Sequence, residues 1–256
     1  MDVLNNILQI PERSLVTKKI TKAFFKRNFD LTSTEKALLD DFNAISGIDW
    51  FASINPANSN INPYKDEHYL FEEVQIIITH TPGNDFERNH QRIADLIQKY
   101  IPYPILLCIL HDNVFVFNAC DKKINQNDST RRIVEKKYST ESINRQAITE
   151  QQQSFLNSLV FSELDKTNLK TYYDSYIQRM IALKAAELSG VFMSRTKERT
   201  QSDMEKLEKI DTLQKEIQIL QSQAKKESQL NQRIVLNTQI QEKRKLIKQL
   251  KALITA

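Results

Sequence analysis

The chain has 256 residues, 40% of them apolar, only 2 cysteines and a formal net charge of +4. Two cysteines exclude a disulfide framework, and no stretch approaches the ~18 consecutive apolar residues that a membrane span needs. Since the N-terminus also lacks the basic and apolar regions of a signal peptide, we expect a soluble, cytoplasmic protein that makes no contact with a membrane.

Two helices are predicted first. Residues 12–28 have the pattern of a basic amphipathic helix, with lysine and arginine side chains opposite an apolar face. A second helix should begin at Thr32, because Glu35 stands three residues later, as a capping box requires. Gly47 should end this helix.

Strands and one further helix follow. Residues 48–54 and 69–79 are rich in β-branched and aromatic side chains, which is typical of strands. The second segment contains an isoleucine run long enough for a central strand. Asp85 is placed to cap a helix over residues 86–100.

A β-hairpin and an edge strand complete this region. Residues 105–110 and 114–119 are apolar runs separated by a short polar turn, and they should bury Cys108 and Cys120 as free thiols. Residues 133–138 read as a charged edge strand. We therefore predict an α/β (α+β) domain over residues 1–150, with a small mixed sheet flanked by helices.

The C-terminal part should be helical. Residues 151–194 are too apolar for a solvated rod and should pack on the α/β domain as helices. Residues 195–256 carry 14 basic and 8 acidic side chains, and all of this excess falls within residues 225–256. A localised basic charge favours an acidic partner or nucleic acid, and we predict a basic coiled coil here.

Two apolar seams define this coiled coil. Their spacing slips near residues 225–228, which indicates either a helical hairpin that turns there or a stutter in one continuous rod. The two halves are nearly equal in length, which favours the hairpin. The seam residues are Leu207, Ile210, Leu213, Ile217 and Leu220 in the first half, and Leu236, Ile240, Ile247, Leu250 and Ile254 in the second.

Motifs for common chemistry are missing from the sequence. The 4 histidines lie on different predicted elements without metal-ligand spacing, and there is no glycine-rich phosphate loop or nucleophile elbow. We therefore expect no metal, no cofactor and no catalytic residue.

One enzymatic alternative stays open. Nucleases of the restriction-endonuclease type hold Mg²⁺ with an aspartate and a Glu-x-Lys strand, and the lysine steadies charge near the attacking water. Asp112 or Asp121 could combine with Glu135 and Lys137 in this way. Charged residues that merely protect an edge strand would give the same pattern.

The stretch from Lys122 to Lys137 places six basic side chains around a polar centre. We predict a loop with an Asx-type turn, whose cations could contact phosphates regardless of base sequence. No aromatic residue lies among them to support base stacking, and a solvated loop would explain the charges equally well. The candidate contacts are Lys122, Lys123, Asn125, Asn127, Asp128, Arg131 and Arg132.

Five ordered segments carry a resemblance to a known family. They are FEEVQIIIT at 71–79, IPYPILL at 101–107, KKINQNDSTRRIVE at 122–135, YIQRMIALKAAELSG at 176–190 and NQRIVLNTQI at 231–240. With them the chain resembles an uncharacterised bacterial family, a domain of unknown function, commonly encoded beside SNF2-type helicases and DNA methyltransferases in restriction or phage-defence clusters. The residues 102–104 open the strand whose hairpin partner leads into the basic stretch, so these two segments should meet in space.

The resemblance implies an accessory role. The leading hypothesis is a non-enzymatic interaction subunit of a bacterial DNA-processing assembly, which contacts DNA or a partner through the basic loop and the coiled coil. A helicase- or methyltransferase-like protein would be that partner. The metal-dependent nuclease is the first alternative, and a structural homodimer without DNA contact is the second.

Overall fold

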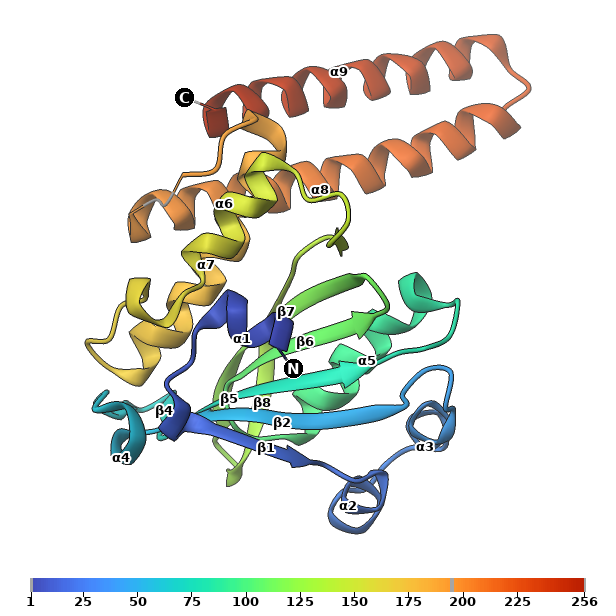
Figure 1. Cartoon of the computed structure of the whole chain (residues 1–256). Coiled ribbons are helices and arrows are strands. Elements are labelled where there is room, and N and C mark those ends of the chain that lie inside the picture. Colours follow the sequence, from blue (N-terminus) through green and yellow to red (C-terminus); the bar gives the residue numbers. More distant parts are fainter. Residues whose placement is uncertain (1, 194–195, 256) are drawn as a thin grey trace. The chain divides into compact units, whose positions relative to one another are not determined.

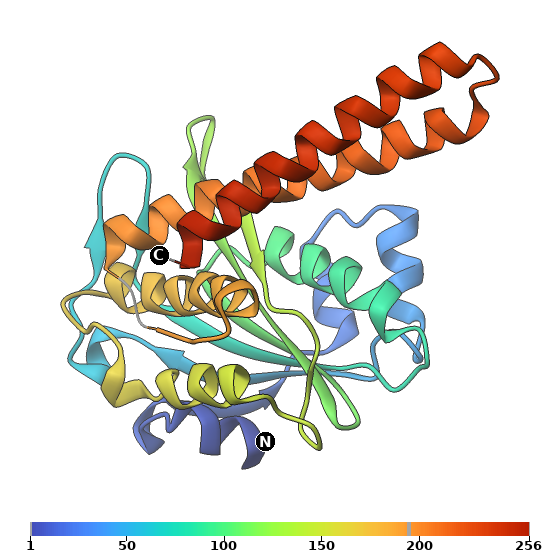
Figure 2. The same ribbon diagram turned by 90° about the horizontal axis from the view of Figure 1, so that it is seen from above.

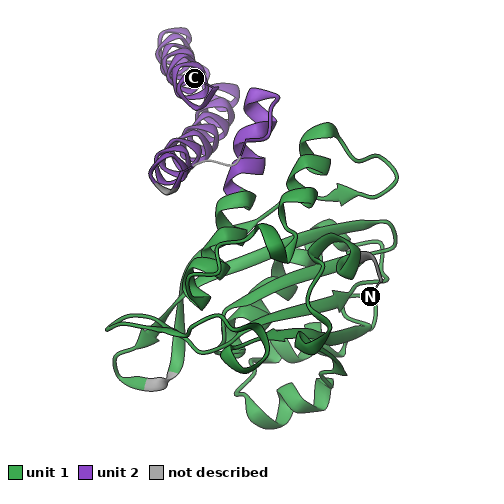
Figure 3. Cartoon of the chain, turned by 60° about the vertical axis from the view of Figure 1, so that its left-hand side comes forward, with its two compact units in different colours: residues 1–180 green, residues 181–256 purple. Residues whose placement is uncertain are grey.

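The computed structural model describes residues 2–193 and 196–255 (Figure 1). The chain divides into two compact units, residues 1–180 and 181–256 (Figure 3). The three-part division expected from the sequence, with boundaries after residues 150 and 194, stays a prediction. Within the described ranges, no helix is long and apolar enough to cross a membrane.

A mixed sheet forms the centre of the first unit. Among the described residues it has seven strands, in the order β1-β2-β5-β6-β7-β8 with β9 beside β7. Only β5 and β6 run parallel, and the other neighbours are antiparallel. The strands are β1 (Leu15–Lys19), β2 (Gly47–Ile54), β5 (Val74–His80), β6 (Ile105–His111), β7 (Val114–Asn125), β8 (Asp128–Ser139) and β9 (Ile143–Asn144).

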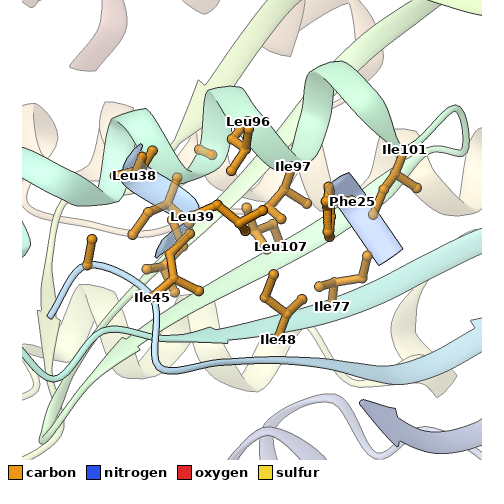
Figure 4. Close-up of a cluster of buried hydrophobic side chains, with 14 of the residues drawn as sticks. Phe25, Leu38, Leu39, Ile45, Ile48, Ile77, Leu96, Ile97, Ile101 and Leu107 are labelled. Atoms are coloured by element: carbon orange, nitrogen blue, oxygen red, sulfur yellow. The ribbon is translucent and has the colours of Figure 1, made fainter. Parts of the chain in front are cut away.

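The helix α5 (Phe86–Tyr100) connects the two parallel strands and has the predicted bounds, although the side chain of Asp85 makes no capping hydrogen bond. It packs with α2 (Lys22–Asn28) and α3 (Ser33–Asp40) around one cluster of buried apolar side chains (Figure 4). Ile97 of α5 and Leu107 of β6 are fully buried within it. A mixed α/β unit with helices flanking its sheet is therefore confirmed.

The helix predicted over residues 12–28 is wrong in its first half. A short 3₁₀ turn, Glu12–Ser14, leads into β1, which pairs with β2 as an edge strand. Thr21 then caps α2, since its side chain accepts a hydrogen bond from the amide of Phe24. Backbone pairing with β2 overrides the helical spacing of the apolar residues, and such tertiary contacts lie beyond local propensity.

Two other local predictions have clear outcomes. The Thr32–Glu35 capping box is present, with both reciprocal hydrogen bonds. The strand predicted over residues 69–79 is divided, because β4 (Leu70–Phe71) leaves the main sheet and pairs with β3 (Tyr64–Lys65). The remaining short helices of the N-terminal part are α1 (Asp2–Leu8) and α4 (Pro56–Ser59).

Further helices follow the sheet in sequence: α6 (Glu150–Ser158) and α7 (Leu169–Ser189), with a 3₁₀ turn between them. Tyr173 of α7 is buried, and its hydroxyl accepts from the amide of Cys120 at 2.9 Å and lies 3.0 Å from the carbonyl of Ile105. This hydroxyl ties α7 to β6 and β7. Both cysteines are buried and free, as predicted.

The second unit contains two long helices, α8 (Lys197–Lys226) and α9 (Leu230–Thr255), joined by a short turn (Figure 2). They run antiparallel, since Lys243 pairs with Glu216 at 2.6 Å and Arg199 donates to the carbonyl of Leu253 at 2.9 Å. The hairpin is therefore present, and the alternative of one continuous rod is wrong. At the turn, the side chain of Glu227 accepts from the amide of Gln229, and the extended backbone of Glu227, with φ of −76°, requires no glycine.

Burial along the hairpin follows the expected seams. Leu207, Ile210, Leu213, Ile217, Ile240 and Ile254 are buried, and Leu220, Leu236, Ile247 and Leu250 are half-buried. The apolar seams of α8 and α9 are thus shielded from solvent within one chain.

Candidate functional site

The basic stretch is not a loop. It is a two-stranded ribbon, because β7 continues to Asn125 and β8 begins at Asp128. Asn125 shapes the turn by accepting the amide of Asn127 at 2.9 Å. The polar centre is thus explained by turn formation, and the predicted loop at residues 122–137 is corrected to a β-hairpin.

Lys122 is buried rather than available to a phosphate. Its amino group donates to the carbonyls of Ile101 and Tyr103 at 2.8 and 2.9 Å. Burial lowers the pKa of Lys122 to about 7. These bonds confirm that the Ile101–Pro104 segment and the basic stretch meet, and they assign Lys122 to holding that segment.

The other cations of the ribbon largely have internal partners. Lys123 pairs with Glu135 at 2.7 Å, and Arg131 pairs with Asp128 at 3.1 Å. Arg132 donates to the carbonyl of Arg131 at 3.0 Å. Breaking an exposed ion pair of this kind costs little free energy. While the pairs are formed, however, the ribbon offers little net positive charge to an incoming phosphate.

The candidate nuclease residues do not converge. Asp112 lies in the turn between β6 and β7 with φ of 46°. Asp121 accepts from the hydroxyl of Tyr138 at 2.7 Å, and burial raises the pKa of Asp121. Glu135 faces Lys123, whereas Lys137 pairs with Asp95 of α5 at 2.6 Å.

A β-bulge separates the two ends of the Glu-x-Lys pattern. The pairing of β7 with β8 shifts by one residue between Asp121 and Lys122, which leaves Glu135 as the additional residue. A bulge breaks the alternation of faces along a strand, so Glu135 and Lys137 point to opposite sides of the sheet. Across the described ranges, no group of three His, Cys, Asp or Glu side chains could hold a metal ion.

A pocket of about 390 Å³ lies where β5 and β6 end. His80 and Thr81 form part of its wall, together with Arg145. The ring of His80 lies 2.8 Å from the carboxylate of Asp49, which is buried. The histidines lack metal-ligand spacing in the sequence, so no site was predicted at them, although His80 and His111 end adjacent strands and that placement was a usable signal.

The clearest charged surface is on α9. We call Arg233, Arg244, Lys245, Lys248 and Lys251 the α9 basic stripe. Within the part of the chain that the structure describes, none of these five forms an ion pair, whereas Lys243 on the seam pairs with Glu216. The sequence indicated the basic excess of this region but not that one helix face would leave it unneutralised.

Comparison with known proteins identifies the family but no characterised relative. The family model described as Domain of unknown function (DUF4391) matches residues 8–247. No curated protein and no solved structure matches the chain significantly. Because the match spans the sheet, its helices and most of the hairpin, the chain belongs to the DUF4391 family.

Proposed function

We propose that this protein is a non-enzymatic accessory subunit that binds nucleic acid through the α9 basic stripe. The observation that carries the proposal is the contrast between two basic surfaces. The ribbon cations are buried or paired, whereas the five cations of the stripe have no carboxylate partner among the described residues. Only one acidic residue, Glu242, lies on α9.

The helical geometry of α9 suits a phosphate backbone. Arg244, Lys248 and Lys251 are spaced i, i+4 and i+7, so they share one face over about 10 Å of helix axis. Their long side chains can reach successive phosphates, and such contacts do not depend on base sequence. Neither α8 nor α9 contains an aromatic residue, so we expect backbone contact rather than base stacking.

The hairpin would present this stripe as a rigid element. We infer that α8 and α9 associate as a short antiparallel coiled coil, with the two buried seams facing each other. The resemblance to a family encoded beside helicases and methyltransferases supports a protein partner of one of those types. Restriction or phage defence is the process that this resemblance suggests.

The test compares two charge-matched variants of the full chain. One replaces Arg244, Lys248 and Lys251 with Gln, and the other replaces the ion-paired Lys123, Arg131 and Lys137 with Gln. Fluorescence anisotropy with a labelled DNA duplex, between 50 and 200 mM salt, gives the salt dependence of affinity. Three lost phosphate contacts should reduce the slope of log K against log salt by about 2.7.

We expect that loss only in the α9 variant, with the ribbon variant close to wild type. An unchanged slope in the α9 variant would show that the stripe makes no phosphate contact. Loss in the ribbon variant alone would move the interface to β7 and β8. A duplex that fails to bind the wild-type protein at 50 mM salt would remove the nucleic-acid proposal altogether.

A further inference from the structure

The pocket at the ends of β5 and β6 is built from one apolar and one polar side. Leu4 and Ile7 of α1 face Ile78, Cys108 and Phe115 of the sheet across its interior. Its volume of about 390 Å³ lies in the range of small-molecule sites. Ligands in open α/β sheets bind beyond the carboxyl ends of parallel strands, and β5 and β6 are the parallel pair here.

Arg145 supplies a cation at the rim of this pocket. Its guanidinium donates to the carbonyl of Asp112 and, at 3.5 Å, to the side chain of Asn113. The Nε atom is buried without a hydrogen-bond partner in the described chain, and no carboxylate there forms an ion pair with Arg145. Burial raises the pKa of the Cys108 thiol, which lines the same pocket, and the charge of Arg145 is a smaller, opposing effect.

Two more polar groups stand beside Arg145. His80 is held through Nε2 by the buried Asp49, which leaves Nδ1 without a hydrogen-bond partner in the described chain. Thr81 is 1% exposed, and its hydroxyl oxygen is buried without a partner there. Buried polar atoms are normally satisfied, so the unpartnered Thr81 hydroxyl and Arg145 Nε in the wall of one pocket indicate a site shaped for a polar ligand group.

Two acidic side chains lie at this site, and among the described residues neither forms an ion pair with Arg145. The buried Asp49 faces His80. Asp112 lines the pocket, but its side chain is 82% exposed and lies 3.9 Å from the ring of His111. The carboxylate of a ligand could therefore pair with the guanidinium of Arg145 and act as its counter-ion.

We propose that this pocket binds a small amphiphilic carboxylate, with its anionic head at Arg145 and His80 and an aliphatic chain between α1 and the sheet. This proposal does not rest on the nucleic-acid surface of α9, since the described residues that line the pocket all belong to the first unit. A bidentate carboxylate suits an arginine, and the aliphatic walls favour an unbranched hydrocarbon over a nucleotide base.

Titration calorimetry of the full chain tests the site with fatty acids of four to ten carbons. Affinity should rise about fourfold per methylene until the pocket is filled, and then level off. Octanamide has the same chain and a neutral head, so it should bind at least tenfold more weakly than octanoate. Absence of heat for every chain length would overturn the proposal.

Three variants separate the contribution of the ligand's head from that of its chain. Arg145→Gln should weaken octanoate at least tenfold and leave octanamide unchanged, and Arg145→Lys should restore part of the loss. Ile7→Trp should fill the pocket and abolish both. Far-ultraviolet circular dichroism verifies that each variant is folded.

A fourth variant checks the location of the site. The Arg244, Lys248 and Lys251 to Gln variant should bind octanoate as wild type does, whatever it does to DNA. Octanoate binding that is lost with the α9 cations and kept in Arg145→Gln would place the ligand on the helix and refute the pocket site.

Discussion

Lys122 combines a polar head group with a buried position. Its two hydrogen bonds go to carbonyls, and burial lowers its pKa to about 7 from 10.5. A neutral amine has two N–H groups, which match these two carbonyls. The side chain therefore acts as a clamp on Ile101 and Tyr103 that works best without its proton.

The pH dependence of stability follows from this shift. Between pH 10.5 and 7 the unfolded chain binds a proton at Lys122 that the folded chain does not, so the free energy of unfolding falls as the pH falls. The total loss is at most roughly 5 kcal/mol, and it is complete below about pH 7. The stability of Lys122→Met should lack this dependence on pH. At pH 10 the variant should be less stable than wild type, because the two hydrogen bonds to the carbonyls are lost.

Urea denaturation of both proteins from pH 7 to 10 measures the effect. We expect the stability difference between wild type and Lys122→Met to shrink as the pH is lowered. Parallel curves for the two proteins would show that Lys122 keeps an ordinary pKa in the folded state.

At the scale of elements, the hairpin depends on one buried face of α8. Ile210 is 3% exposed and Ile219, on the same helix, is 59% exposed. Replacing Ile210 with Ala removes buried apolar surface and leaves a cavity, which costs about 2–5 kcal/mol. Ile219→Ala makes the same chemical change on the solvated side and should cost less than about 0.5 kcal/mol.

Denaturant unfolding followed by far-ultraviolet circular dichroism compares these variants. We expect the helical signal to be lost at a lower denaturant concentration in Ile210→Ala, and at the wild-type concentration in Ile219→Ala. Equal shifts in both variants would mean that the seam of α8 is not packed in solution as the structure has it.

At the scale of the whole molecule, the association state depends on where the two seams are used. Their buried side chains lie within a single chain, so a second copy is not required to cover them. We expect light scattering at micromolar concentration to give the monomer mass of 29.9 kDa. A dimer mass that reverts to monomer in Ile240→Asp would instead favour a structural homodimer built through the hairpin.

Much of this architecture was predictable from local patterns. The capping box at Thr32, the helix at Phe86–Tyr100 and the strand before it follow from cap chemistry and from the period of apolar residues. The phase slip near residues 225–228 was compatible with a hairpin or with a stutter in one rod, and the nearly equal length of the two halves favoured the hairpin. The excess of basic over acidic residues in the C-terminal region could likewise be counted directly from the sequence.

Only the tertiary structure decided which strands and which charged side chains pair with each other. The segment Leu15–Lys19 became a strand because β2 offered it backbone partners, which no local propensity encodes. Lys122 entered the core while Lys123 stayed at the surface, and a bulge turned Glu135 away from Lys137. The sequence by itself determined which elements form and where charge accumulates. The fold determined which charges are neutralised, because ion pairing and burial depend on neighbours that are distant along the chain.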